Sequence, residues 1–290
     1  MENSLKWAKT QIMNSQQEYH QLFNTKPLIP YLQVVEYHQR QQIFDLILAE
    51  NIEYRYLNGS CEDRTHLICL LLKKAGFDSG KIWNFAPARY TLLSNELFQI
   101  QDPLGISNPL YWGFHVSPYI LSYNQNGELE TLIFDLSFNT QKFLSIAEWQ
   151  AFMNCPRALY LQTDLENYLF YSIESYSLRS AKIGNNPVYN IPAIQPSIIT
   201  GDFWKLAPEE TLVQNGLAIN DLAMYIYNTK SKMDAAEQNY LSETLTNIDW
   251  LDGFVFCPKP PEISEQLHAE LIGFYKQRFD FWDNKIKMLS

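Results

Sequence analysis

The sequence predicts an α+β fold, in which an antiparallel sheet packs with a helix that begins at a cysteine and a helical region follows. Turn residues at 58–60 lead directly into Cys61 and an apolar run that ends before Gly76. Aromatic and β-branched stretches at 111–117 and 131–137 flank a polar turn, as in a hairpin. After residue 208, apolar residues recur with helical spacing. We predict a domain at 1–185, with N-terminal helices, and a helical C-terminal region at 186–290.

Composition and charge narrow the classes of partner. The 290 residues are 46% hydrophobic, which is enough for a sizeable core. The net charge of −10 argues against nucleic acid or an anionic membrane as the main partner. No apolar segment approaches bilayer length, and the first residues lack the pattern of a signal peptide. We expect synthesis in the cytoplasm, and translocation without a classical signal peptide stays open.

The four cysteines are spread along the chain and form no CxxC pair. HxxxH and HExxH pairs are also missing, so we expect free thiols, no metal and no cofactor. Cys69 lies within an apolar run and is predicted to be a core residue, whereas Cys155 and Cys257 each precede a proline and are predicted in loops or at element ends.

Cys61 differs from the other cysteines because it begins a predicted helix. Unpaired N–H groups and a partial positive charge at a helix start favour a thiolate, and such cysteines have pKa values of roughly 3.5–7.5. The sequence therefore predicts Cys61 as a nucleophile with a lowered pKa and as the most readily alkylated thiol.

The remaining elements follow in order. The first 50 residues are predicted to be mainly helical, with one helix near Trp7, another at 37–48, and a break at Pro27 and Pro30. An extended segment is expected at 52–56 and a strand at 81–85, followed by an irregular segment to 109. Strands at 158–161 and 167–171 are expected to join the sheet. A loop-like stretch at 184–202 separates them from a helix reaching about residue 247, with Gly216 as a possible interruption, and from a final amphipathic helix after Pro261.

The predicted hairpin brings a histidine and an aspartate together. A turn centred on Gln125 pairs His115 with Asp135 as direct cross-strand neighbours. A two-residue turn at 126–127 instead pairs His115 with Phe138. The sequence leaves both registers open.

Cys61, His115 and Asp135 supply the groups of a thiol acyl-transfer site: a nucleophile, a base and a carboxylate that orients the base. His66 is a poor alternative base, because five residues turn a helix by roughly 140° from Cys61. Arg64 and Thr65 share the helix face of Cys61.

Three ordered blocks resemble the bacterial protein-glutamine glutaminases, papain-like enzymes related in site architecture to transglutaminases. They are Cys61-x-x-Arg64-x-His66, residues 112–118 and residues 133–137. The resemblance implies a papain-like or transglutaminase-like catalytic domain with Cys61 as nucleophile, His115 as general base and Asp135 as its partner. It also implies release of ammonia from a glutamine side chain, with Arg64 anchoring the helix start. This chain departs from the family pattern at Leu136, where the family has proline, and in its long C-terminal addition.

The expected function is thiol-dependent deamidation of glutamine in a protein or peptide through a thioester, in an effector or toxin. The Cys61 backbone N–H is one expected oxyanion donor, and the second donor is not identified. A partner protein is expected at the C-terminal helices. Two alternatives stay open: acyl transfer to an amine, in biosynthesis or protein modification, and a catalytically silent binding module. The presence of all three polar residues argues against the silent module, and no acceptor channel is evident in residues 51–139, which favours hydrolysis.

Overall fold

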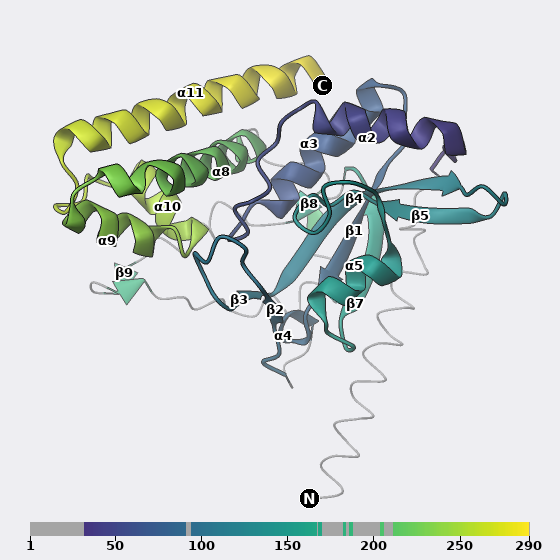
Figure 1. Ribbon diagram of the computed structural model, residues 1–290, viewed down its shortest axis with the longest axis horizontal. Coiled ribbons are helices and arrows are strands. Elements are labelled where there is room, and N and C mark those ends of the chain that lie inside the picture. Colours follow the sequence, from purple (N-terminus) through teal and green to yellow (C-terminus); the bar gives the residue numbers. More distant parts are fainter. Residues whose placement is uncertain are drawn as a thin grey trace, which may run out of the picture.

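An antiparallel sheet lies beneath the helices that begin and end the described chain (Figure 1). The computed structural model describes residues 32–90, 94–166, 168–169, 182–183, 186–187, 204–205 and 211–289. Within these residues the main sheet has the strand order β6-β5-β4-β1-β7, and every neighbouring pair is antiparallel. Its strands are β1 (Gly80–Phe85), β4 (Phe114–Tyr123), β5 (Leu129–Ile133), β6 (Leu144–Ser145) and β7 (Leu159–Asp164). The predicted α+β class with an antiparallel sheet is therefore confirmed.

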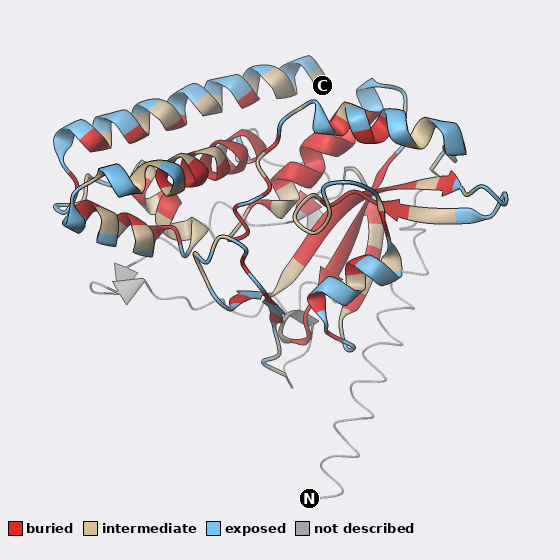
Figure 2. Ribbon diagram, in the orientation of Figure 1, coloured by how far each residue is buried: buried red, intermediate tan, exposed pale blue. Residues whose placement is uncertain are grey.

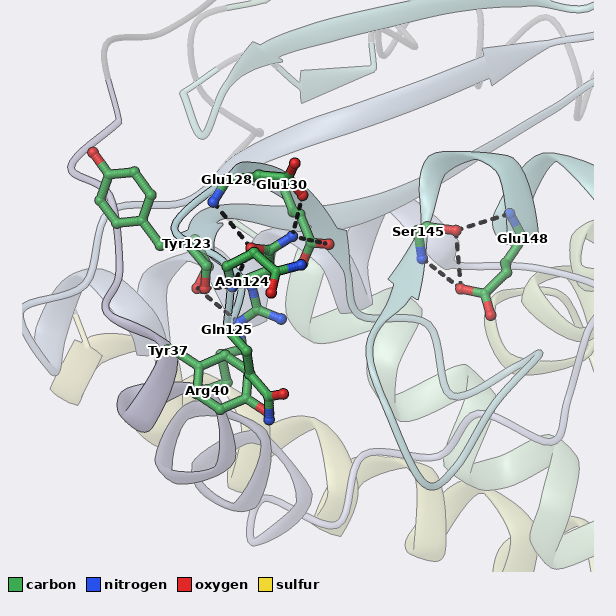
Figure 3. A network of polar contacts seen from close by, with 11 residues as sticks. Tyr37, Arg40, Tyr123, Asn124, Gln125, Glu128, Glu130, Ser145 and Glu148 are labelled. Carbon is green, nitrogen blue, oxygen red and sulfur yellow. Dashed lines mark hydrogen bonds and ion pairs between the residues drawn. The ribbon is translucent and has the colours of Figure 1, made fainter.

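The hairpin of β4 and β5 has neither of the two predicted registers. Tyr123 pairs with Leu129, so the turn is centred on Asn126. The Asn124 side-chain oxygen accepts hydrogen bonds of 2.9 Å from the N–H groups of Asn126 and Glu128, which closes the longer loop (Figure 3). Gly127 has a φ of 80°, a conformation that favours glycine.

As a consequence His115 and Asp135 are not paired in the ladder. His115 pairs with Asn84 of β1, and Asp135 follows the end of β5 at Ile133. The prediction that they are direct cross-strand neighbours is wrong, although their side chains do meet.

An arginine ties the hairpin to helix α2 (Arg40–Leu48), which follows the 3₁₀ helix η1 (Tyr37–Gln39). Arg40 donates to Ser122 Oγ at 2.8 Å, to the Tyr123 carbonyl at 2.6 Å and to Glu130 Oε2 at 2.8 Å (Figure 3). The helix predicted at 37–48 is confirmed, and its buried residues Ile43, Phe44 and Ile47 face the core.

Helix α3 (Cys61–Lys74) begins and ends as its sequence predicts. At its C-terminus Gly76 has a φ of 83°, while the N–H groups of Gly76 and Phe77 bond to the carbonyls of Lys73 and Leu72. This is a glycine-terminated Schellman motif. The helix contacts β4 on one side and α8 on the other, so it lies between the sheet and the C-terminal helices (Figure 1).

The C-terminal helical region packs on α3 and shares its core. Its helices are α8 (Leu212–Thr229), η2 (Lys230–Lys232), α9 (Ala235–Thr244), α10 (Ile248–Phe256) and α11 (Glu265–Leu289). Buried residues from α2, α3, α8 and α11 form one continuous apolar cluster, and Tyr56 donates to the Leu245 carbonyl at 2.9 Å. Figure 2 shows that α8 is buried over much of its length, while α11 exposes its outer face.

A second apolar cluster covers the other face of the sheet. It includes Trp149 and Met153 of α5 (Ile146–Met153), packed with Ile82 and Ile133 of the sheet. The sequence prediction left 86–109 irregular, but this stretch contains α4 (Pro87–Tyr90) and β2 (Phe98–Ile100), which pairs with β3 (Leu110–Trp112). Helices α5 and α10 were also not predicted.

Further short strands complete the described elements. They are β8 (Tyr168–Leu169), β9 (Lys182–Ile183), β10 (Asn186–Pro187) and β11 (Trp204–Lys205). β7 joins the main sheet as predicted, whereas β8 pairs with β11 instead. The predicted helix near Trp7 and the predicted boundary loop lie largely outside the described residues. In the part of the chain that the structure describes, every helix is too short or too polar to cross a bilayer.

Candidate active site

Cys61 lies at the first position of α3, at the end of a tight turn. Ser60, the preceding residue, has a φ of 59°, and its carbonyl accepts the first helical bond from Arg64 N at 3.2 Å. The Cys61 side chain is half-buried, and its backbone N–H has no acceptor among the described residues. A free N–H at this position is the expected consequence of a helix start.

Two glycines allow the C-terminal helices to pack directly on this turn. A Cβ atom at Gly216 of α8 would lie 1.8 Å from Asp63 Oδ2, and one at Gly59 would lie 2.2 Å from Ile248 of α10. A larger residue at either position would force these neighbouring side chains, or the elements that carry them, to shift. Gly216 therefore permits close approach and does not interrupt α8, contrary to the sequence prediction.

His115 is held by an aromatic ring and by Asp135. Its ring stacks on Trp112 with a centroid distance of 4.7 Å and an interplanar angle of 21°. Its Nε2 lies 2.6 Å from Asp135 Oδ2, and both side chains are buried. Because Nε2 is engaged by the carboxylate, Nδ1 is the ring nitrogen available for proton transfer.

Asp135 Oδ2 accepts two further bonds of 2.8 Å, from Ser117 Oγ and Trp149 Nε1. Burial by itself raises the pKa of Asp135. His115 and these two donors together lower the pKa by more than burial raises it, so it lies below its usual value. The carboxylate is thus kept charged in a buried position. Sequence reasoning missed Trp149, because no local pattern connects this helix residue to a site formed by strands.

Cys61 and His115 line the same pocket, which has a volume of about 510 Å³. The Cys61 thiol also contacts the backbone of Val116, the residue after His115. Thr65, one helical turn after the cysteine, donates to the Val116 carbonyl at 3.1 Å and ties α3 to β4 at this point. Of the predicted trio, Cys61 and His115 line this cavity, and Asp135 lies behind the histidine and binds its ring.

The C-terminal helices form the opposite side of the pocket. Lining residues from this region are Leu212, Asn215, Gly216, Thr246, Asn247, Ile248, Asp249 and Asp252. None of them was predicted as a site residue, because their approach to Cys61 depends on long-range packing.

The predicted lowering of the Cys61 pKa is wrong. Burial raises the pKa of the thiol, and Glu62, whose Oε2 accepts from Sγ at 3.3 Å, raises it further. Arg64 and the Val116 backbone lower the pKa, but their effect is smaller. The raised pKa favours the protonated thiol.

Arg64 supports the turn from behind, which agrees with the anchoring role that the resemblance implies. Its guanidinium is buried, lies over the Tyr54 ring at 5.4 Å, and donates to the carbonyls of Glu53 and Tyr56 at 3.5 and 3.4 Å. These contacts hold the segment leading to Cys61.

His66 points away from the thiol, also as predicted, and accepts from the buried Lys81 Nζ at 2.9 Å. Burial and then Lys81 lower the pKa of His66 to about 3, and burial lowers the pKa of Lys81 to about 8. His66 is therefore neutral at pH 7, and it is a structural residue.

Protonation of His66 should destabilise the fold. His66 binds a proton below about pH 6.5 in the unfolded state but only near pH 3 in the folded state. The stability that neutral His66 contributes to the fold is therefore complete above pH 6.5 and is lost as pH falls toward 3. We expect His66 to account for a loss of about 2 kcal/mol between about pH 7 and pH 5. His66→Gln keeps an acceptor for Lys81 without titrating, so urea unfolding should show a smaller pH dependence. Equal pH dependence in both proteins would contradict this assignment.

A family model matches the part of the chain that contains the three blocks. Residues 33–153 match the family model described as Glutaminase, and this range includes Cys61, His115 and Asp135. The match confirms the resemblance predicted from the sequence. No curated protein matches the chain.

Several solved structures are similar at low identity. A crystal structure of protein-glutaminase is 18% identical, with 54% of this chain and 96% of that chain covered and a TM-score of 0.38. The NMR structure of protein-glutaminase from Chryseobacterium proteolyticum is 17% identical, with 61% of this chain and 92% of that chain covered and a TM-score of 0.38. A crystal structure of pro-protein-glutaminase is 18% identical, with 47% of this chain and 49% of that chain covered and a TM-score of 0.37.

Proposed function

We propose that this chain is a cysteine-dependent amidohydrolase that deamidates glutamine side chains of proteins or peptides, with a papain-like arrangement of Cys61, His115 and Asp135. The glutaminase match over residues 33–153 supports deamidase activity in general. The observation on which the thiol mechanism rests is that His115, paired with buried Asp135 at 2.6 Å, lines the same pocket as Cys61.

The first half of the reaction transfers the acyl group to sulfur. Nδ1 of His115 removes the thiol proton as Sγ of Cys61 attacks the amide carbon, since the raised pKa favours the protonated thiol. Asp135 holds the imidazole in the required tautomer and stabilises its charged form. The imidazolium then donates its proton to the leaving nitrogen, the C–N bond breaks, and ammonia and a thioester result.

The second half regenerates the enzyme. His115 takes a proton from water, the hydroxide oxygen bonds to the thioester carbon, and the C–S bond breaks as the thiolate leaves. The thiolate regains a proton from His115, and the new carboxylic acid releases its own proton to solvent to give a glutamate side chain. Both tetrahedral intermediates place negative charge on the former carbonyl oxygen.

Two donors are available for that oxygen. The Cys61 backbone N–H is free at the helix start, as expected from the sequence. Asn58 lines the same pocket, and its Nδ2 is buried without a hydrogen-bond partner among the described residues. A buried donor without a partner is costly unless a ligand uses it. We assign Asn58 as the second oxyanion donor.

Asn58→Ala should lower kcat by roughly 10²- to 10³-fold, because the lost bond is strongest when the oxygen is charged. KM should change little, which separates this role from ground-state binding. Steady-state ammonium release from a glutamine peptide measures both constants. A higher KM with an unchanged kcat would assign Asn58 to substrate binding instead.

Amine transfer remains the second candidate for one structural reason. The C-terminal helices supply a wall of the pocket, and such a wall is what an acceptor channel requires. The test of the proposed function is to incubate glutamine peptides with the protein and with Cys61→Ala, and to measure ammonium and product mass. Deamidated product formed only by the wild type supports the proposal.

A further inference from the structure

We propose that the pocket selects glutamines that have a lysine or arginine beside them in the substrate, and that Glu62 recognises this positive charge. The inference rests on the proposed function, because it names the class of substrate for the same site. It goes beyond that function by assigning specificity to a residue outside the three catalytic groups.

Glu62 lies beside the Cys61 sulfur at the wall of the pocket. It follows Cys61 in the first turn of α3, is half-buried, and lines the pocket. Its Oε2 accepts from the Cys61 thiol at 3.3 Å. Among the described residues it makes no ion pair, so its charge is available to a ligand. A cation bound by this carboxylate would lie close to the sulfur that attacks the glutamine.

Two aspartates line the opposite wall. Asp249 and Asp252 of α10 line the pocket, and Asn215 Nδ2 donates to Asp252 Oδ1 at 3.2 Å. The charge of Glu62 at the wall of this cavity attracts cations and repels anions.

The other charged lining residues are directed elsewhere. Asp63 is buried and bonded to the Tyr168 hydroxyl. Arg64 is buried and donates to backbone carbonyls behind the turn, and His115 is paired with Asp135. Arg64 therefore makes no ion pair with Glu62.

The contact between Glu62 and Cys61 couples recognition to reaction. The Glu62 charge beside the sulfur disfavours the thiolate. A substrate cation that pairs with Glu62 weakens this effect at the moment the glutamine is bound. Part of the binding energy of a basic substrate is thus used to assist the nucleophile, which should raise kcat as well as lower KM.

The test uses peptides of equal length that differ at one position, with lysine, alanine or glutamate beside the glutamine. In the wild type, kcat/KM should be at least about tenfold higher for the lysine peptide than for the glutamate peptide. Glu62→Gln should reduce this ratio severalfold. Glu265→Gln removes the same charge from an exposed residue at the start of α11 and should retain the wild-type ratio.

Equal kcat/KM values for the lysine and glutamate peptides would overturn the proposal, as would a ratio that Glu62→Gln leaves unchanged. A cross-linked product from the lysine peptide, in place of the deamidated one, would also overturn it. That result would make the lysine an acceptor instead of a recognition element.

A second measurement does not depend on turnover. Aminoethyl and sulfonatoethyl methanethiosulfonates are matched cationic and anionic thiol reagents, and mass spectrometry resolves their labelling at each cysteine. The ratio of cationic to anionic labelling rates should be higher at Cys61 than at the exposed Cys257, and Glu62→Gln should lower it only at Cys61. If no peptide is deamidated, the proposed function fails while this ratio still decides the charge preference. If the ratio of cationic to anionic labelling rates at Cys61 is the same in the wild type and in Glu62→Gln, the inference is overturned.

Discussion

Replacement of Cys61 by alanine should lower the rate of ammonia release by at least about 10⁴-fold. The proposed reaction forms a thioester on this sulfur, and no other cysteine among the described residues lines the pocket. Alanine suits the first turn of a helix and removes only a half-buried thiol, so stability should change by less than about 1 kcal/mol. Steady-state ammonium release and urea unfolding measure the two effects.

Cys257→Ala is the matched control, because its thiol is exposed and lies outside the pocket. It should keep wild-type activity. If Cys61→Ala releases ammonia at the wild-type rate while folded, Cys61 is not the nucleophile and the thiol mechanism is wrong.

Asp135→Asn should lower kcat by roughly 10³- to 10⁴-fold. An amide cannot stabilise the His115 imidazolium as a carboxylate does. In the wild type, Asp135 accepts bonds from the His115 ring, Ser117 Oγ, Trp149 Nε1 and the Ser137 N–H. The NH₂ group of asparagine would face one of these donors and could not accept its bond. The unmatched donor should add a loss of stability of about 1–3 kcal/mol.

Asp221→Asn separates the catalytic loss from the structural one. Asp221 of α8 accepts 2.7 Å bonds from Trp282 Nε1 and Arg278 Nε, so it resembles Asp135 in its tryptophan donor but lies outside the pocket. Its replacement should reduce stability and leave kcat/KM unchanged. A similar loss of kcat in both variants would show that Asp135 acts through the fold alone.

The helix that presents Cys61 was predictable because its signals are local. Turn residues before Cys61 and the glycine after Lys74 mark both ends of α3, and the structure confirms them. The charge state of the thiol was not predictable from the same signals. It depends on burial and on the direction of the Glu62 side chain, and both are set by tertiary packing.

The meeting of His115 and Asp135 was predicted for an incorrect reason. The sequence contained the hairpin, but the five-residue loop closed by Asn124 shifted the register. Asp135 reaches the histidine from beyond the strand end, where Trp149 and Ser117 also bind it.

The sequence contains one feature that indicates the pocket wall formed by α8 and α10, and its meaning is clear only from the structure. Gly216 interrupts a helical apolar pattern without ending the helix, and the structure shows that it permits contact with the Cys61 turn. A glycine inside a predicted helix indicates a close approach but does not identify the approaching element.

The most direct test of the central claim is the fate of the glutamine carbonyl in heavy-oxygen water without any added amine. If Cys61 and His115 perform amide hydrolysis, ammonium and glutamate should form in equal amounts, and each new carboxylate should contain one oxygen from the solvent. Cys61→Ala should give neither product. Ammonium release that requires a primary amine, with an amine adduct and no solvent oxygen in the product, would contradict hydrolysis and assign the site to acyl transfer.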